Sequence, residues 1–330
     1  MRIAVLAVAL AGTLCAAENV PVIVDTDCGG DDLMAIAFLL ARRDVRIEAV
    51  TIANGVAHVR PGADNVLRLL EIAGREEIPV YLGGDTPLQG TAAFPEVWRK
   101  SADVPTGSHP AQKAPQPQTA ADYLVSRSLE RSRPVHILAL GPLTNLGAAL
   151  RHAADAMRNA DIWIMGGAVF APGNLGDGGY FQTSNKTAEW NFYVDPAAAK
   201  AVFASGARIH LVPLDATNQV QIDEKLFRAF QSKARSALGR YVTAILKQHL
   251  PEIRETIYFA WDPLAAVAMV EPGTVQERQM AIEIKQIPPE EGRTAEMPGY
   301  PPNAGVALNA DAGSFRLAFF RAFTSFRLSR

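Results

Sequence analysis

Short apolar runs bounded by turn residues recur along the chain and alternate with segments that carry a helical pattern. The apolar runs at 20–27 and 45–53 are typical of buried strands. Each is followed by a segment, 31–42 or 61–73, whose apolar residues favour a helix. Four later runs repeat the strand pattern: "IPVYLG" (78–83), "VHILALG" (135–141), "ADIWIMGG" (160–167) and "RIHLVPLD" (208–215).

Three further segments predict helices with proline in the first turn, where its missing N–H is tolerated. They are "GPLTNLGAALR" (141–151), "DPAAAKAVFA" (195–204) and "WDPLAAVAMV" (261–270). This alternation predicts an α/β fold with a mostly parallel, doubly wound, Rossmann-like sheet and helices on both faces. Residues 84–118 and 286–304 are rich in proline and glycine and are predicted to be surface excursions. Neither is long enough to link independent domains, so we expect a single domain over 18–330.

The first seventeen residues, "MRIAVLAVALAGTLCAA", combine one arginine, an apolar stretch and small residues at the end of that stretch. This pattern predicts a signal peptide over 1–17, cleaved after Ala17, and an exported protein that is periplasmic or extracellular. A buried first strand is the alternative. Cys15 hints at lipoprotein processing, but Leu14 stands where a small residue would be expected. After cleavage Cys28 is the remaining cysteine, which excludes an intramolecular disulfide.

The chain has 330 residues, of which 48% are hydrophobic, and a formal net charge of −2. This length and apolar content are enough for a substantial core. The pI near 6.3 and the lack of any run of like charge argue against a nucleic-acid or anionic-membrane partner, since such partners usually bind a basic surface. No stretch after the first seventeen residues is long and apolar enough to span a bilayer.

Polar residues fall where the predicted strands end. In a parallel sheet these ends share one edge, where ligands bind in α/β folds. We therefore expect the polar residues after the strands to lie close together at that edge. They are Asp25, Asp27, Asn54, Thr144, Asn145 and Asp215.

Acidic side chains are most concentrated in "DTDCGGDD" (25–32), which holds four aspartates between two apolar segments. Two carboxylates about 4 Å apart repel by roughly 1 kcal/mol in water and several times more when partly buried. Such a cluster indicates a bound cation, and oxygen ligands favour Ca²⁺ or Mg²⁺. The alternative is a solvated turn with helix caps. An EF-hand is excluded because its twelfth position would be Ile36, and an aspartyl-nucleophile phosphatase is disfavoured by Gly29.

Four motifs, in this order and spacing, make the chain resemble the inosine/uridine-preferring nucleoside hydrolases over roughly 20–325. They are "DTDCGGDD", "LALGPLTNLGAAL", "AEWNFYVDPAAA" and "WDPLAAVA". The resemblance implies an α/β fold with Ca²⁺ at the carboxyl edge of the sheet. It also implies hydrolysis of the N-glycosidic bond of ribonucleosides to ribose and free base, and a homo-oligomer, either a dimer or a tetramer.

The resemblance also implies residue roles. Asp27 and Asp32 bind Ca²⁺ together with Asp262 and the backbone carbonyl of Thr144, and Asp27 accepts a proton from a metal-bound water. Asp31, Asn185, Glu189 and Asn191 bind the ribose, Asn54 lies near the sugar or base, and Asp25 supports the loop. The chemistry agrees with these residue types, because carboxylates around the sugar stabilise the positive charge that develops as the base leaves.

Two positions depart from the family pattern. Cys28 stands where proline is common, and its backbone role is expected to be retained. Trp261 replaces the histidine that often protonates the leaving base. An indole cannot supply that proton, but it can stack on a purine, so purine nucleosides are slightly favoured. Candidate proton donors upstream are Tyr258, His249 and Arg254, and Trp98 could supply a second ring.

Two alternative functions use the same scaffold. A non-catalytic nucleoside- or sugar-binding protein is one, although such a protein would be free to lose the carboxylates that this chain keeps. A hydrolase of another N-riboside is the other, because base specificity resides in loops such as 84–118 and 248–260.

Overall fold

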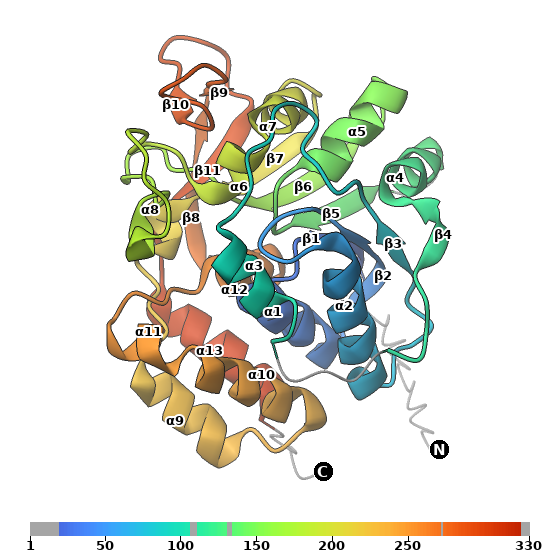
Figure 1. The fold of residues 1–330 in the computed structure, drawn as a ribbon, viewed down its shortest axis with the longest axis vertical. Coiled ribbons are helices and arrows are strands. Elements are labelled where there is room, and N and C mark those ends of the chain that lie inside the picture. Colours follow the sequence, from blue (N-terminus) through green and yellow to red (C-terminus); the bar gives the residue numbers. More distant parts are fainter. Residues whose placement is uncertain (1–19, 106–110, 131–133, 272, 325–330) are drawn as a thin grey trace, which may run out of the picture.

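The fold was analysed in a computed structural model that describes residues 20–105, 111–130, 134–271 and 273–324. The predicted signal peptide, 1–17, lies outside these residues. Within them, nine strands form one sheet in the order β4-β3-β2-β1-β5-β6-β7-β11-β8 (Figure 1). Every neighbouring pair is parallel except β11 and β8, so the predicted mostly parallel sheet is confirmed.

The strands of this sheet are short and most are apolar. They are β1 (Val20–Thr26), β2 (Val45–Ile52), β3 (Val80–Leu82), β4 (Gln116–Thr119), β5 (Val135–Ala139), β6 (Ala160–Met165), β7 (Arg208–Val212), β8 (Val275–Met280) and β11 (Ala304–Ala310). A separate antiparallel pair consists of β9 (Ile282–Ile284) and β10 (Thr294–Glu296).

The helices occupy most of the remaining chain. They are α1 (Gly30–Ala41), α2 (Val59–Ala73), α3 (Glu96–Ala102), α4 (Ala120–Leu129), α5 (Thr144–His152), α6 (Trp190–Val194), α7 (Pro196–Phe203), α8 (Leu214–Thr217), α9 (Glu224–Lys233), α10 (Ala237–Gln248), α11 (Leu250–Arg254), α12 (Trp261–Val270) and α13 (Ala312–Phe323).

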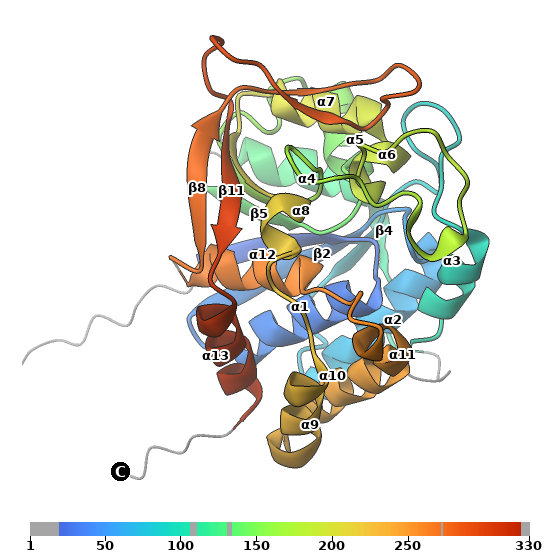
Figure 2. The ribbon, with the colours of Figure 1, turned by 90° about the vertical axis from the view of Figure 1, so that its left-hand side faces the viewer.

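Helices cover both faces of the sheet, as predicted. Successive side chains of a strand point to opposite faces, and in β1 Val22 and Val24 pack into one apolar cluster while Ile23 packs into the other. The first cluster contains residues of α1, α2, α10, α12 and α13, and the second contains residues of α4, α5 and α7. Figures 1 and 2 show these two layers on either side of the strands.

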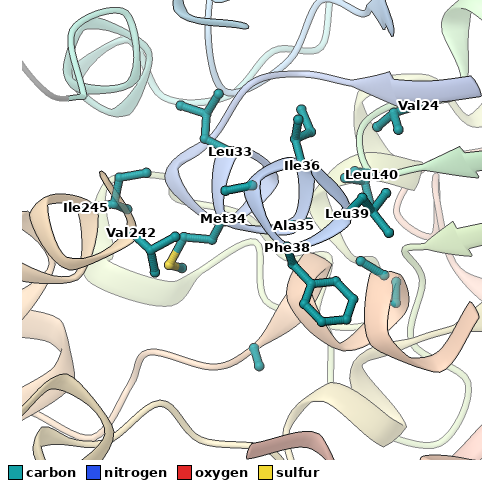
Figure 3. Packing of buried hydrophobic residues seen from close by; sticks show 14 of the residues in the cluster. Val24, Leu33, Met34, Ala35, Ile36, Phe38, Leu39, Leu140, Val242 and Ile245 are labelled. Carbon is teal, nitrogen blue, oxygen red and sulfur yellow. The ribbon is translucent and has the colours of Figure 1, made fainter. Parts of the chain in front are cut away.

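Helix α1 forms the centre of the larger cluster. Its residues from Asp32 to Leu39 are all buried, and a helix that is apolar all round must be surrounded by protein. Figure 3 shows Met34 facing Val242 and Ile245 of α10. Because α1 is enclosed on every side, the aspartates at its N-terminus are held in a fixed position at the edge of the sheet.

The chain order places a crevice beside β1. From β1 the chain runs outward through β2, β3 and β4, and then returns to β5 on the other side of β1. Ligands of open α/β sheets bind at such a reversal, outside the carboxyl ends of the strands. The aspartate motif follows β1 directly, so the fold puts these carboxylates at the position where a ligand is expected.

Several parts of the fold differ from the sequence-based expectation. The excursion 84–118 contains α3 and the start of β4, and 286–304 contains β10, which pairs with β9.

Among the described residues no helix combines the length and the apolar character needed to cross a bilayer.

His210, in strand β7, lies between two carboxylates. Its Nδ1 lies 2.8 Å from Oε1 of Glu277, and its Nε2 lies 3.4 Å from Oδ1 of Asp161. Burial alone would lower the pKa of His210, but hydrogen bonds to Asp161 and Glu277 raise it to about 9. This imidazole is therefore a charged structural group at neutral pH.

Candidate active site

Asp32 organises the turn between β1 and α1. Its Oδ1 accepts hydrogen bonds from the Thr26 hydroxyl and the Asp27 N–H, and its Oδ2 accepts one from the Gly29 N–H at 3.0 Å. These donors hold a carboxylate that is almost fully buried, and burial raises its pKa. One side chain thus fixes both the N-terminus of α1 and the position of Asp27.

Asp27 lies in a tight cradle of backbone. Its Oδ2 accepts a hydrogen bond from the Val56 N–H at 2.9 Å. A Cβ atom added at Gly55 would lie 1.9 Å from this oxygen, and one added at Gly141 would lie 2.8 Å from the Asp27 Cβ. The loops after β2 and β5 can close around Asp27 because both positions lack a side chain. Burial, followed by repulsion from Asp32, raises the pKa of Asp27.

Three carboxylates form a group that could hold a metal ion. One ligand atom from each of Asp31, Asp32 and Asp262 lies within 4.8 Å of the others. Asp262 is buried, and its Oδ1 has no hydrogen-bond partner among the described residues. Burial and then repulsion from Asp32 raise the pKa of Asp262, and raise that of Asp31 to about 7.

This group fits a hard cation, because an unpartnered buried carboxylate oxygen is unfavourable unless a positive charge meets it. Asp32 and Asp262 were predicted as metal ligands and meet here. Asp31, predicted to bind ribose, belongs to the group as well. Asp27 borders it through Asp32 but is not one of its three members.

The expected meeting of polar residues at the edge of the sheet is found for the carboxyl ends of β1 and β5. Asp25 accepts hydrogen bonds from the Thr51 hydroxyl and from Asn145 Nδ2 at 2.8 Å. Thr144, predicted to offer its carbonyl to the metal, is buried at the start of α5, and its hydroxyl donates to Asp195 Oδ2 at 2.8 Å. Asp25 therefore supports the loop, as predicted.

Asp215 has a different role from the other polar residues at strand ends. Its carboxylate accepts hydrogen bonds from the backbone N–H groups of Val169, Phe170 and Ala171 at 2.8–3.1 Å. It therefore fastens the loop after β6.

Glu189 and Asn191 lie at the start of α6. Glu189 caps this helix through the Asn191 N–H, accepts a second hydrogen bond from the Gly167 N–H, and has its pKa raised to about 7 by burial. The Asn191 Nδ2 donates to the carbonyls of Leu140 and Met165. These bonds tie α6 to the carboxyl ends of β5 and β6. The Asn191 Oδ1 accepts no hydrogen bond from a described residue.

Asn185 and Asn54, also predicted to bind substrate, are occupied by protein contacts. The Asn185 Oδ1 accepts from Thr187 and from the Ala188 N–H, and its Nδ2 donates to the Glu291 carbonyl at 2.8 Å. The Asn54 Oδ1 accepts from Arg99 Nη2 at 2.6 Å. One N–H of Asn185 and the amide nitrogen of Asn54 are left to meet a ligand.

Sequence reasoning missed Arg99 and Asp195. The signal for Asp195 was available, because an aspartate before Pro196 is a typical helix cap. Asp195 caps α7 and also holds Thr144. Arg99 lies inside an excursion that was expected to be surface.

Trp261 begins α12 next to Asp262. The centroids of the Trp261 and Tyr258 rings lie 5.5 Å apart, and the two rings are nearly perpendicular. Among the candidate proton donors, Arg254 pairs with Glu224 on the surface. Tyr258 is buried, its hydroxyl has no hydrogen-bond partner within the described part of the chain, and burial raises its pKa well above the ordinary value. His249 stacks on Tyr258 at 4.7 Å, and burial lowers its pKa.

The backbone at Cys28 differs from the expectation that it retains the role of a proline. Its φ is +65°, in the left-handed region, whereas proline is fixed near −65°. Its N–H donates to the Thr26 hydroxyl at 3.0 Å, which proline could not do. The side chain is fully buried, and burial raises the pKa of the thiol, so Cys28 is a packing residue in this turn.

We expect Cys28→Pro to lower the free energy of unfolding by about 3 kcal/mol or more, because it removes a hydrogen bond and demands the wrong φ. Cys28→Gly is the matched control, since glycine adopts a positive φ without strain. Removing the backbone strain of about 1–2 kcal/mol should offset the stability lost with the buried side chain. Urea unfolding of both variants measures the difference. Equal stability of the two would contradict the backbone assignment.

A family model described as "Inosine-uridine preferring nucleoside hydrolase" matches residues 22–316. The chain belongs to this family. It is 33% identical over 266 residues to "Probable uridine nucleosidase 2" of Oryza sativa subsp. japonica, covering 76% of this chain and 74% of the relative. It is 32% identical to "Pyrimidine-specific ribonucleoside hydrolase RihA" of Citrobacter koseri, covering 91% and 98% of the two chains.

Solved structures agree with this assignment. The plant nucleoside hydrolase PpNRh1 superposes with a TM-score of 0.81 at 30% identity, covering 92% of this chain and 99% of that one. As a nucleoside hydrolase, the protein is an enzyme that cleaves the N-glycosidic bond of small-molecule ribonucleosides. The carboxylates in the first turn of α1 and at the start of α12 form its candidate active site.

Proposed function

We propose that this nucleoside hydrolase binds Ca²⁺ through Asp27, Asp32, Asp262 and the Thr144 carbonyl, and that Asp27 is the general base of the reaction. The observation that carries the proposal is the unpartnered buried oxygen of Asp262 beside Asp31 and Asp32. Ca²⁺ accepts six to eight oxygen ligands in flexible geometry, which suits a site made of carboxylates and a carbonyl. A bound cation lowers the pKa of a water ligand and orients sugar hydroxyls.

The residues of the chain supply the remaining chemistry. Asp27 is fixed by the Val56 N–H, which holds its carboxylate in place to take a proton from the attacking water. The carboxylates around the sugar stabilise the positive charge that develops on the ribose as the base leaves. Asn191 Oδ1 and Asp31 are proposed to accept hydrogen bonds from the ribose hydroxyls, which would hold the anomeric carbon against the attacking water.

The range of bases is part of the proposal. The purine preference suggested by Trp261 stays a prediction, and the printed names of the two curated relatives point to uridine and other pyrimidine nucleosides. We therefore propose that the enzyme accepts uridine, and that Trp261 adds affinity for larger bases by stacking.

We expect Trp261→Ala to lower kcat/KM for inosine by about tenfold or more and to affect uridine less, because stacking of a base on an aromatic ring contributes about 1–3 kcal/mol. Phe259→Ala is the matched control, since it removes a neighbouring ring that packs on Trp261. Steady-state kinetics with both nucleosides measure the ratio. Equal losses on the two substrates would remove the stacking argument.

Base release from inosine, adenosine, guanosine, uridine and cytidine tests the proposed function, with purified Ca²⁺-loaded protein and HPLC detection of free base. We expect turnover of at least one nucleoside, with ribose released in equal amount. Tight binding of a nucleoside without turnover would favour the non-catalytic alternative. Nicotinamide riboside is assayed beside these five, and its turnover without turnover of any of them would favour a hydrolase of another N-riboside.

Export and assembly are proposed on separate grounds. The N-terminal pattern over 1–17 supports export, and the mass of the secreted mature protein would reveal cleavage after Ala17. A dimer or tetramer is proposed from the family resemblance alone, and light scattering of the purified enzyme tests it.

A further inference from the structure

Helix α3 bridges two sides of the candidate active site. On one side the ring of Trp98 packs against Trp190, with 5.5 Å between centroids, and Trp190 lies between Glu189 and Asn191 in the chain. On the other side Arg99 Nη2 donates to the Asn54 Oδ1 at 2.6 Å. Asn54 directly precedes Gly55, whose backbone touches Asp27. Consecutive residues of α3 thus contact both walls of the site.

A second segment holds α3 in this position. The Tyr180 ring packs on Trp98 with 5.9 Å between centroids. Figure 2 shows the yellow-green loop between β6 and α6 running down to α3. Trp98, which precedes Arg99 in the chain, is fixed by its packing on Trp190, and Asn54, which accepts the hydrogen bond of Arg99, is buried. The guanidinium of Arg99 is therefore preorganised.

Arg99 carries a charge that the described protein does not neutralise. No carboxylate of a described residue pairs with its guanidinium, whereas the neighbouring Lys100 pairs with Glu96. The Nε atom of Arg99 is buried and has no acceptor among the described residues. A buried donor without a partner is unfavourable, and the planar guanidinium fork suits a ligand that presents oxygen or nitrogen acceptors in one plane.

The reaction requires a group with these properties. When the C1′–N bond breaks, its electron pair stays on the base, the water oxygen bonds to C1′, and the water gives one proton to Asp27. The base nitrogen later takes a proton from solvent. Position 261 holds a tryptophan, which supplies no proton, so the departing base needs its negative charge stabilised by another residue.

We infer that Arg99 contacts the nucleobase and stabilises the negative charge on the base as it leaves the ribose. Arg99 keeps its own proton throughout and acts by charge and hydrogen bonding. This role rests on the proposed hydrolysis of nucleosides. It assigns to α3 the leaving-group function that Trp261 cannot perform, and it predicts a dependence on the leaving group.

The test compares uridine with p-nitrophenyl β-D-ribofuranoside, whose leaving group departs as a stable anion and needs little help. For Arg99→Met we expect kcat on uridine to fall by about 10²-fold, the loss typical of one charge-stabilising donor. On the nitrophenyl riboside we expect a change within about threefold. Arg99→Lys keeps the charge without the fork and should lose less on uridine. Lys100→Met removes a charge from the next position and should behave as wild type on both substrates.

The outcomes separate the possible roles of Arg99. An equal loss on both substrates would make Arg99 a structural support of Asn54 and overturn the inference, and so would wild-type kinetics of Arg99→Met. A selective loss on uridine in His249→Ala, without one in Arg99→Met, would assign the role to His249 instead. If Arg99→Met does not fold, as judged by its melting curve, the selectivity of Arg99→Lys decides. Wild-type protein that cleaves neither substrate, and no nucleoside of the panel above, would refute the proposed function itself.

Discussion

Removing divalent metal from this protein should abolish nucleoside hydrolysis and lower its melting temperature more at pH 7.5 than at pH 5.5. The cause is the group of Asp31, Asp32 and Asp262 together with Asp27. Burial raises the pKa of these carboxyls above the ordinary aspartate value, for Asp31 from 3.8 to about 7. Without a cation, deprotonation forces neighbouring negative charges together.

The sign of the pH effect follows from proton binding. Between pH 3.8 and about 7 the metal-free native state holds a proton on Asp31 that the unfolded chain has lost, so its stability falls as pH rises through this window. The raised pKa values of Asp27, Asp32 and Asp262 act in the same direction. Each extra bound proton contributes about 1.4 kcal/mol per pH unit. A cation reverses the trend because it favours the ionised carboxylates. Metal should therefore stabilise the protein by an amount that grows with pH.

Differential scanning calorimetry with EDTA, Ca²⁺ or Mg²⁺ at the two pH values measures this effect. We expect the gap between EDTA and Ca²⁺ to exceed about 5 °C at pH 7.5, since about 1 kcal/mol shifts the melting temperature by roughly 2 °C in chains of this size. Asp262→Asn should shrink the gap, and Asp64→Asn, which changes an exposed carboxylate paired with Arg60, should not. A gap that is absent, or equal at both pH values, would contradict a metal site here.

The sequence predicts the centre of this fold better than its edges, because buried parallel strands are apolar runs. β1 and β5 were found within two residues of their observed ends. β4 ("QPQT") is exposed throughout and the four central residues of β8 ("VQERQM") are exposed, and neither strand carries an apolar pattern. Such edge strands form because a neighbour offers free backbone groups, and that information lies elsewhere in the chain.

The candidate site divides in a similar way. The aspartates of "DTDCGGDD" were visible because their charge density is itself unusual. Arg99 was not, because its partner Asn54 lies 45 positions away and nothing in the local sequence marks the contact. The positive φ of Cys28 was also hidden, since the bonds among Thr26, Gly29 and Asp32 impose it. Unusual residue types were therefore predictable, whereas backbone geometry and contacts between distant segments were not.

Asp27→Asn should lower kcat for nucleoside hydrolysis by about 10³-fold, within the range of 10²–10⁴ that a general base contributes. Asparagine has the same shape, and its oxygen can still accept the Val56 N–H, so the cradle formed by Gly55 and Gly141 should survive. The variant loses the ability to take a proton from the attacking water. Because binding contacts to the sugar remain, we expect KM to change far less than kcat.

Asp25→Asn is the matched control, because it makes the same chemical change two residues earlier in the same motif. Asp25 is bonded to Thr51 and Asn145 and supports the loop, so its amide variant should lose stability and only a small part of kcat. Steady-state kinetics, together with the melting temperature of each variant in Ca²⁺, separate the two roles. Equal losses of kcat in both variants would show that the motif acts through its structure, and that Asp27 is not the base.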